Sequence, residues 1–335
     1  MVQQINEAEP GAVAPTDVRT EHFAFVLLDN FTLIAFACAI EPLRLANRMA
    51  GRTHYEWSVL TETGAPARAS NGVAIAADGP LGEVGRETTV VVVGGLGVKR
   101  AITRPLLTWL RRAARQGAPI AALCTGPEAM AEAGLLSGRR CTIHWENRDS
   151  FEEEHPEIAL TQTIYVIDQN RYTAAGGTAS ADLMLKLIAS RHGAALASLV
   201  ADQMIHTTVR SERDEQRLSI PTRIGARNPK LAMVIHSMEA GIEDPVSPAV
   251  LAGNVGMSTR QLERLFRRYL GRSPKRYYMD LRLQKARNLL QQTDMSVINV
   301  ALACGFASPS HFSKCYRALY KTTPYRERGT SEAPL

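Results

Sequence analysis

The sequence predicts a parallel α/β sandwich followed by an all-α domain with two helix-turn-helix units. Three observations lead to this prediction. Strand-like and helix-like segments alternate from Glu21 to about residue 209, which is typical of a parallel sheet covered by helices on both faces. After Pro229 the pattern is helical throughout. In this second part, two short apolar helices each end at a glycine, and a serine that can cap a second helix follows shortly after.

The length and the charge distribution fit two domains with different tasks. The 335 residues are enough for two hydrophobic cores. The chain carries 39 Lys and Arg against 33 Asp and Glu, but 16 of the basic and only 8 of the acidic residues lie after position 229. The first part, with the remaining 23 and 25, is therefore nearly neutral. A basic domain joined to a neutral one is typical of a sensor with a nucleic-acid-binding module, although a basic face that only meets solvent is the alternative.

The cysteines and the N-terminal segment indicate a cytoplasmic protein. The five cysteines are odd in number and widely spaced, so neither a disulfide framework nor a metal site is predicted. No nucleotide-binding loop is found, and no cofactor is expected. Residues 1–20 lack the order of a signal peptide, and no apolar run reaches membrane-spanning length. These first 20 residues are rich in Pro, Gly and Ala, and we expect them to be disordered.

The α/β domain is expected over residues 21–209. Apolar or alternating segments predict its strands, and the valine-rich segment 88–93 is typical of a buried central strand. Segments with apolar residues at helical spacing predict its helices. The last two strands surround Asp168-Gln169-Asn170 and suggest a hairpin. In order, the predicted strands are residues 23–28, 55–61, 73–76, 88–93, 119–123, 164–167 and 172–174, and the predicted helices are residues 33–49, 105–115, 126–133 and 179–190.

A polar, charged segment over residues 210–228 predicts a linker, and the helical domain is expected over residues 229–328. Ser-Pro occurs at 247–248, 273–274 and 308–309, and a serine commonly caps a helix whose first residue is proline. The Ser-x-x-Gln sequence from Ser258 to Gln261 predicts a capping box. The predicted helices are residues 231–239, 248–255, 259–270, 274–291, 297–303 and 309–320.

The two helix-turn-helix units predict a DNA-reading surface. Their second helices open at Ser258 and Ser308, 50 residues apart, and basic residues recur on one side of each helix. Arginine can bind guanine edges with two hydrogen bonds, and the N-terminal residues of a recognition helix contact bases. An ordinary helical bundle with solvated arginines is the alternative. The residues expected to contact double-stranded promoter DNA are Arg260, Glu263, Arg264, Ser310, His311, Ser313 and Lys314.

Residues 229–328 resemble the AraC/XylS-type transcription regulators. The resemblance is carried by Ala301-x-x-Cys304-Gly305-Phe306 and by Phe312-Ser313-Lys314-x-Tyr316. It implies two helix-turn-helix units in one monomer, joined by a long helix and reading successive major grooves. The chain is therefore expected to be a sequence-specific transcription regulator.

The first domain carries a cysteine at a strand-to-helix turn. Cys124 precedes Gly126, and His144 follows twenty residues later. A thiol near a helix N-terminus is expected to have a lowered pKa. This arrangement, over residues 21–205, resembles the glutamine amidotransferase-like superfamily, which includes PfpI-type proteases. The resemblance implies a nucleophilic cysteine with a later histidine as base, and a loop at Gly94-Gly95 that faces them.

A glutamine amidotransferase-like domain followed by an AraC-type domain is characteristic of the GlxA-like regulators. The segments Glu41-Pro42-Leu43-Arg44-x-Ala46-Asn47 and Cys141-x-x-His144-Trp145-Glu146 resemble regulators of glycine betaine and carnitine catabolism. In chemically active relatives an acidic residue early in the first helix often supports the cysteine, but residues 32–39 contain none. We therefore expect no catalysis, with Cys124 and His144 as vestiges of a catalytic pair.

The pocket of an open α/β sheet lies where strand ends meet helix starts. An aromatic ring attracts a desolvated ammonium, so Trp145 is a candidate partner of a quaternary amine, although a packed core position is equally compatible. The helix start at Thr125-Gly126 is a candidate partner of a carboxylate. The residues expected to line an effector pocket are Asn30, Gly94, Gly95, Cys124, Thr125, His144, Trp145 and Thr178.

These observations favour a homodimeric activator controlled by a small amine or amino-acid derivative, such as a betaine. An effector that prefers one arrangement of the protein shifts the population towards it. Two alternatives remain open. One is a Cys124-dependent amidase or protease with a DNA-binding tail, and the other is a regulator that senses oxidants through Cys124.

Overall fold

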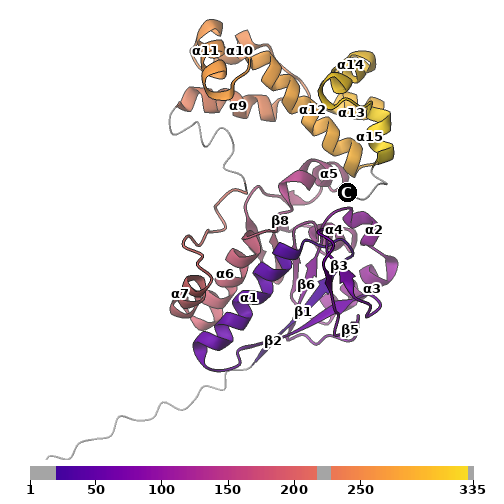
Figure 1. Cartoon of the computed structure of the whole chain (residues 1–335), viewed down its shortest axis with the longest axis vertical. Coiled ribbons are helices and arrows are strands. Elements are labelled where there is room, and N and C mark those ends of the chain that lie inside the picture. Colours follow the sequence, from indigo (N-terminus) through magenta and orange to yellow (C-terminus); the bar gives the residue numbers. More distant parts are fainter. Residues whose placement is uncertain (1–19, 217–227, 331–335) are drawn as a thin grey trace, which may run out of the picture.

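The computed structural model describes residues 20–216 and 228–330. Figure 1 shows two bodies, an α/β domain below and a helical domain above, and both were predicted. The predicted disorder of residues 1–20 and most of the predicted linker lie outside the described residues. No described helix combines the length and the hydropathy needed to cross a bilayer.

The α/β domain is built on a seven-stranded sheet with the order β10-β11-β7-β6-β1-β2-β5. Neighbouring strands are parallel, except for the antiparallel hairpin of β10 and β11. Two small sheets pair β3 with β4 and β8 with β9. The strands are β1 (Glu21–Leu27), β2 (Tyr55–Thr61), β3 (Ala67–Arg68), β4 (Ala74–Ile75), β5 (Gly79–Pro80), β6 (Thr88–Val93), β7 (Ile120–Leu123), β8 (Arg140–Cys141), β9 (Ala159–Leu160), β10 (Tyr165–Asp168) and β11 (Arg171–Ala174).

Helices cover both faces of this sheet, as expected for buried parallel strands. Side chains alternate across β1, so that Phe25 packs in one core and Val26 in the other. One face is covered by α1 (Leu33–Ala50), α6 (Ala179–His192) and α7 (Ala194–Gln203). On the other side lie α2 (Val98–Ala101), α3 (Arg104–Arg115), α4 (Pro127–Glu132), the 3-10 helix η1 (Trp145–Asn147) and α5 (Arg148–Glu154).

The helical domain has two small cores joined by one long helix, α12. Tyr277 and Tyr278 of α12 lie in the first core, whereas Leu289 and Leu290 lie in the second. The capping box of Ser258 and Gln261 is present as predicted. The helices are α9 (Pro229–Ala240), α10 (Pro248–Asn254), α11 (Thr259–Leu270), α12 (Pro274–Gln292), α13 (Val297–Ala303), α14 (Pro309–Tyr320) and α15 (Pro324–Thr330).

Several elements were not predicted from the sequence. These are the short helices α2, η1, α5 and α15, the helix α7, and the two-residue strands β3, β5, β8 and β9. In addition, residues 210–216 of the predicted linker lie against the α/β domain. The amide of Ile164 donates to the carbonyl of Asp214 (2.9 Å), and the Gln216 side-chain amide donates to the Ile143 carbonyl (2.8 Å).

A buried carboxylate anchors the start of this segment. Asp182 of α6 is fully buried, and its Oδ1 lies 2.9 Å from His206 Nε2. The backbone amide of Arg210 donates to the same oxygen (2.8 Å), and the Arg210 guanidinium donates to Oδ2 through Nη2 (2.6 Å) and Nε (3.0 Å). The chain that leaves the α/β domain is thereby fixed to α6.

Replacing this carboxylate should destabilise the α/β domain. Because Asp182→Ala removes the buried acceptor that holds both His206 and the half-buried Arg210, we expect a loss of about 1.5–3 kcal/mol of unfolding free energy. Urea unfolding followed by tryptophan fluorescence measures it, since all three tryptophans lie in this domain. The control Asp202→Ala, at an exposed position of α7, should change stability by less than about 0.5 kcal/mol. Equal stability of the two variants would contradict the anchoring role.

Candidate effector site and nucleic-acid interface

The turn between β7 and α4 places Cys124 at a sharp elbow. Cys124 has a positive φ of 61°, a conformation that is uncommon for residues other than glycine. The Gly126 amide donates to the Leu123 carbonyl (2.9 Å) and closes the turn, while the Cys124 amide donates to the Ala174 carbonyl of β11 (2.9 Å). We use "the elbow" for residues 123–127.

Two further loops come so close to the elbow that only glycine fits at the point of contact. A Cβ atom on Gly94 would lie 2.4 Å from the Gly126 nitrogen, and one on Gly176 would lie 2.7 Å from the Cys124 Cβ. A Cβ on Gly95 would lie 2.0 Å from the Asn30 carbonyl oxygen. The loops after β1, β6, β7 and β11 therefore converge.

This convergence brings several of the predicted pocket residues together. Thr125 Oγ1 donates to the Gly95 carbonyl (2.8 Å), and the Leu96 amide donates to the Asn30 carbonyl (3.1 Å). His144 joins them because its amide donates to the Cys124 carbonyl (3.1 Å).

The Cys124 thiol is buried, with 6% of its surface exposed. Burial raises its pKa, and this effect outweighs the opposing hydrogen bonds from Thr32 and from the Thr125 amide. The expectation of a lowered pKa was therefore wrong. The helix start does not compensate for the loss of water around the thiolate.

His144 is not arranged as a general base for this thiol. Its Nδ1 accepts from the Glu146 amide (3.4 Å), and burial lowers the pKa of the imidazole. Among the described residues, no hydrogen bond joins the His144 ring to the Cys124 sulfur. The side chain that meets the sulfur is that of Thr32, with Oγ1 at 3.3 Å. Thr32 was not predicted as a site residue. Its position just before α1, at the end of the loop after β1, could have indicated one, because pockets form where strand ends meet helix starts.

One of the two elbow amides is already in use. The Gly126 amide donates to the Leu123 carbonyl (2.9 Å), whereas the Thr125 amide has no backbone acceptor among the described residues. The predicted carboxylate site at Thr125-Gly126 is therefore left with the Thr125 amide alone.

Trp145 and Thr178 are the remaining predicted pocket residues. Trp145 is the first residue of η1; it is half-buried, and its ring centroid lies 5.6 Å from that of His144. Thr178 Oγ1 accepts from Arg210 Nη2 (2.7 Å), so a guanidinium stands beside this residue. Arg210 was not predicted as a site residue, because nothing near it in the sequence marks its partner Asp182.

A separate cavity of about 260 Å³ lies at the ends of β1 and β2. None of the eight predicted pocket residues lines it. Its lining residues are Val26, Leu27, Leu28, Asp29, Thr61, Glu62, Thr63, Ala65, Pro66, Ala67, Ala101, Thr103 and Leu106.

The predicted DNA-reading residues lie on exposed faces of α11 and α14. Leu262 and Phe266 are buried beneath α11, and Phe312 and Tyr316 are buried beneath α14. Ser313 is half-exposed, whereas the other six predicted residues are exposed: Arg260, Glu263, Arg264, Ser310, His311 and Lys314. In Figure 1 both helices lie at the end of the molecule away from the α/β domain. Two exposed helices of this kind on one domain suit binding to DNA.

Comparison with known proteins assigns both halves. A helix-turn-helix domain family matches residues 251–329, and the DJ-1/PfpI family matches residues 24–190. The HTH-type transcriptional regulator GbdR of Pseudomonas aeruginosa is 44% identical over 319 residues, which cover 95% of this chain and 87% of GbdR. The chain belongs to the GlxA-like family of HTH-type transcriptional regulators.

Other relatives agree over nearly the whole length. The regulator CdhR of Pseudomonas aeruginosa is 46% identical over 309 residues, 92% of each chain. The regulator GlxA of Rhizobium meliloti is 37% identical over 313 residues, which cover 93% of this chain and 97% of GlxA. A solved AraC family regulator from Pseudomonas putida is 27% identical with a TM-score of 0.50, covering 55% of this chain and 99% of that one.

Removing a base-reading arginine should weaken specific DNA binding. If Arg264 reads a base, Arg264→Ala should cost about 1–3 kcal/mol of binding free energy. Fluorescence anisotropy measures it, with a DNA fragment that the wild-type protein selects from a random-sequence pool. The control Arg115→Ala removes the same charge from α3 and should leave the affinity unchanged. Unchanged affinity of Arg264→Ala would show that α11 is wrongly assigned.

The buried thiol should react slowly and only at high pH. Because burial raises the pKa of Cys124, its thiolate forms above the ordinary value of about 8.5. The rate of Cys124 alkylation by iodoacetamide, followed by peptide mass spectrometry, should therefore still be rising at pH 9. The same cysteine in urea provides the control with an ordinary pKa. A rate that levels off below pH 8.5 in the folded protein would contradict this account.

Proposed function

We propose that this regulator activates transcription when a small zwitterion, such as a betaine, binds beside the elbow. The observation that carries the regulatory part of the proposal is the similarity to the HTH-type transcriptional regulators GbdR and CdhR over nearly the whole chain, first domain included. The betaine class comes from the resemblance of residues 41–47 and 141–146 to regulators of glycine betaine and carnitine catabolism. We further propose that the protein acts as a homodimer, since most soluble oligomers are symmetric dimers.

The chemistry of the site supports a zwitterionic effector. Trp145 offers an aromatic face to a quaternary ammonium. The carboxylate needs a stronger partner than the predicted helix start, because the Gly126 amide already donates to Leu123 and only the Thr125 amide is left. Arg210 is that candidate: Asp182 and Thr178 engage its Nε and Nη2, and its Nη1 makes no hydrogen bond within the described part of the chain.

The two alternative functions receive less support. An amidase or protease needs a thiolate and a base within hydrogen-bond reach. The thiol here is buried with a raised pKa, and its side-chain neighbour is Thr32 rather than His144. Oxidant sensing needs the same thiolate and exposure, so it is disfavoured for the same reason.

A betaine panel tests the proposed effector class. At about 100 times its dissociation constant, a ligand stabilises the domain that binds it by roughly 2.7 kcal/mol, so one member of the panel should raise the melting temperature saturably. Glycine betaine, carnitine, other methylated amines and amino acids form the panel. Trp145→Leu should abolish the shift, whereas Trp57→Leu, at a half-buried position on β2, should retain it. A flat response, or a full response in Trp145→Leu, would overturn this proposal.

A promoter-reporter assay tests the sign of regulation and the role of Cys124. Expression should rise with effector in the wild type, and Cys124→Ser should respond equally. A response that needs an oxidant and fails in Cys124→Ser would favour redox sensing instead.

A further inference from the structure

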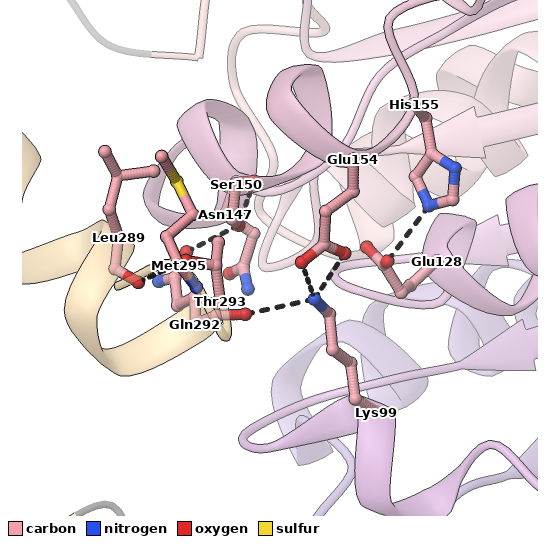
Figure 2. A network of polar contacts seen from close by, with 10 residues as sticks. All are labelled: Lys99, Glu128, Asn147, Ser150, Glu154, His155, Leu289, Gln292, Thr293 and Met295. Carbon is pink, nitrogen blue, oxygen red and sulfur yellow. Dashed lines mark hydrogen bonds and ion pairs between the residues drawn. The ribbon is translucent and has the colours of Figure 1, made fainter. Parts of the chain in front are cut away.

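One residue of the DNA-binding domain is contacted by two segments of the α/β domain, α2 and α5. Gln292 is the last residue of α12, the helix that joins the two helix-turn-helix units. Lys99 Nζ donates to its backbone carbonyl (3.0 Å), and Ser150 Oγ donates to its side-chain Oε1 (2.8 Å). Figure 2 shows both contacts, with α12 on one side and the α/β domain on the other.

Each contacting side chain lies a few residues after a position that contacts the elbow. Gly94 and Gly95 pack against the elbow and Asn30, and the chain runs on from them into α2, which carries Lys99. His144 binds the Cys124 carbonyl, and the chain continues through η1 into α5, which carries Ser150. Only three to five residues therefore lie between each elbow contact and the residue that contacts Gln292.

The two segments are tied to each other and to the α/β core. The Lys99 ammonium pairs with the Glu154 carboxylate at the end of α5. Next to it, His155 Nε2 lies 3.2 Å from Glu128 Oε1, and Glu128 on α4 is buried. Figure 2 shows these pairs side by side. A displacement of α2 or α5 therefore strains the ion pair with the other helix and the contact with α4, which starts at the elbow.

The contact with α12 is polar and includes opposite charges. Both η1 and α5 pack against α12. Burial raises the pKa of Asp149 on α5, and the positive charge of Lys285 on α12 partly opposes this rise. Because water can replace the partners of such polar contacts, breaking them costs little free energy.

The contact does not cover the DNA-reading surface. In Figure 1, α5 meets α12 from the α/β side, whereas α11 and α14 lie beyond α12. The predicted reading residues are exposed in the same arrangement, apart from the half-exposed Ser313. The contact therefore orients the DNA-binding domain and does not block it.

We propose that Gln292, held by Lys99 and Ser150, is the allosteric contact through which the elbow and the DNA-binding domain control each other. A change at the elbow shifts α2 and α5, and through Gln292 it reorients α12 and both helix-turn-helix units. The inference rests on the proposed function only in taking the elbow as the effector site. Its structural claim, that the two places are coupled, can be tested without any effector.

The test breaks the contact at α12 and reads the consequence at the elbow. The variant Lys99→Met/Gln292→Ala removes the ammonium and the amide side chain but keeps the apolar stem of residue 99. The probe is the rate of Cys124 alkylation by iodoacetamide in the full-length protein. We expect the rate to change by about fivefold or more, the lower end of what coupling between protein sites usually gives. The control Lys186→Met/Gln203→Ala makes the same replacements at exposed positions of α6 and α7 and should leave the rate unchanged.

Two other buried thiols separate coupling from unfolding. Cys141 lies in the α/β domain and Cys304 in the helical domain, and burial raises the pKa of each to about 12. If the variant were merely less stable, all three cysteines would react faster. Faster alkylation of all three cysteines, or an unchanged rate at Cys124, would overturn the proposed allosteric role of Gln292. Failure of the betaine panel would instead remove the proposed effector and leave this result standing.

Discussion

The close packing of glycine loops around Cys124 is the constraint on which the rest of this structure depends. A side chain at Gly94, Gly95 or Gly176 would overlap the backbone or Cβ atoms of neighbouring residues. Because these loops meet, the starts of α2, α4 and α6 are brought to one point at the carboxyl edge of the sheet. The position of Lys99, the backbone of His144 and the place of Thr178 all follow from that meeting.

The same packing disfavours thiolate chemistry at the elbow. Water is excluded from the thiol, so the charged form that catalysis requires is disfavoured. The converging loops carry the hydroxyl groups of Thr32 and Thr125 and the His144 imidazole, with the Trp145 ring next to His144 and the Arg210 guanidinium next to Thr178. Groups of these kinds bind a small polar molecule without reacting with it.

Much of the architecture could be predicted from the sequence, but the link between the domains could not. The valines of β6 and the serine caps of α11 and α14 are local signals, and both predictions were confirmed. Helix α5 has no such signal, because Arg148–Glu154 is charged and Phe151 is its only large apolar residue. The pKa of Cys124 and the partners of Arg210 depend on burial by distant segments, which no local pattern encodes.

Reciprocity between effector and DNA tests the central claim most directly. If one site controls the other, the factor by which effector changes the affinity for DNA must equal the factor by which DNA changes the affinity for effector. Titration calorimetry with the effector, in the absence and presence of saturating selected DNA, gives the second factor, and anisotropy gives the first. Our account predicts two equal factors different from one. Effector affinity that is the same with and without DNA would show that the two domains act independently and would contradict it.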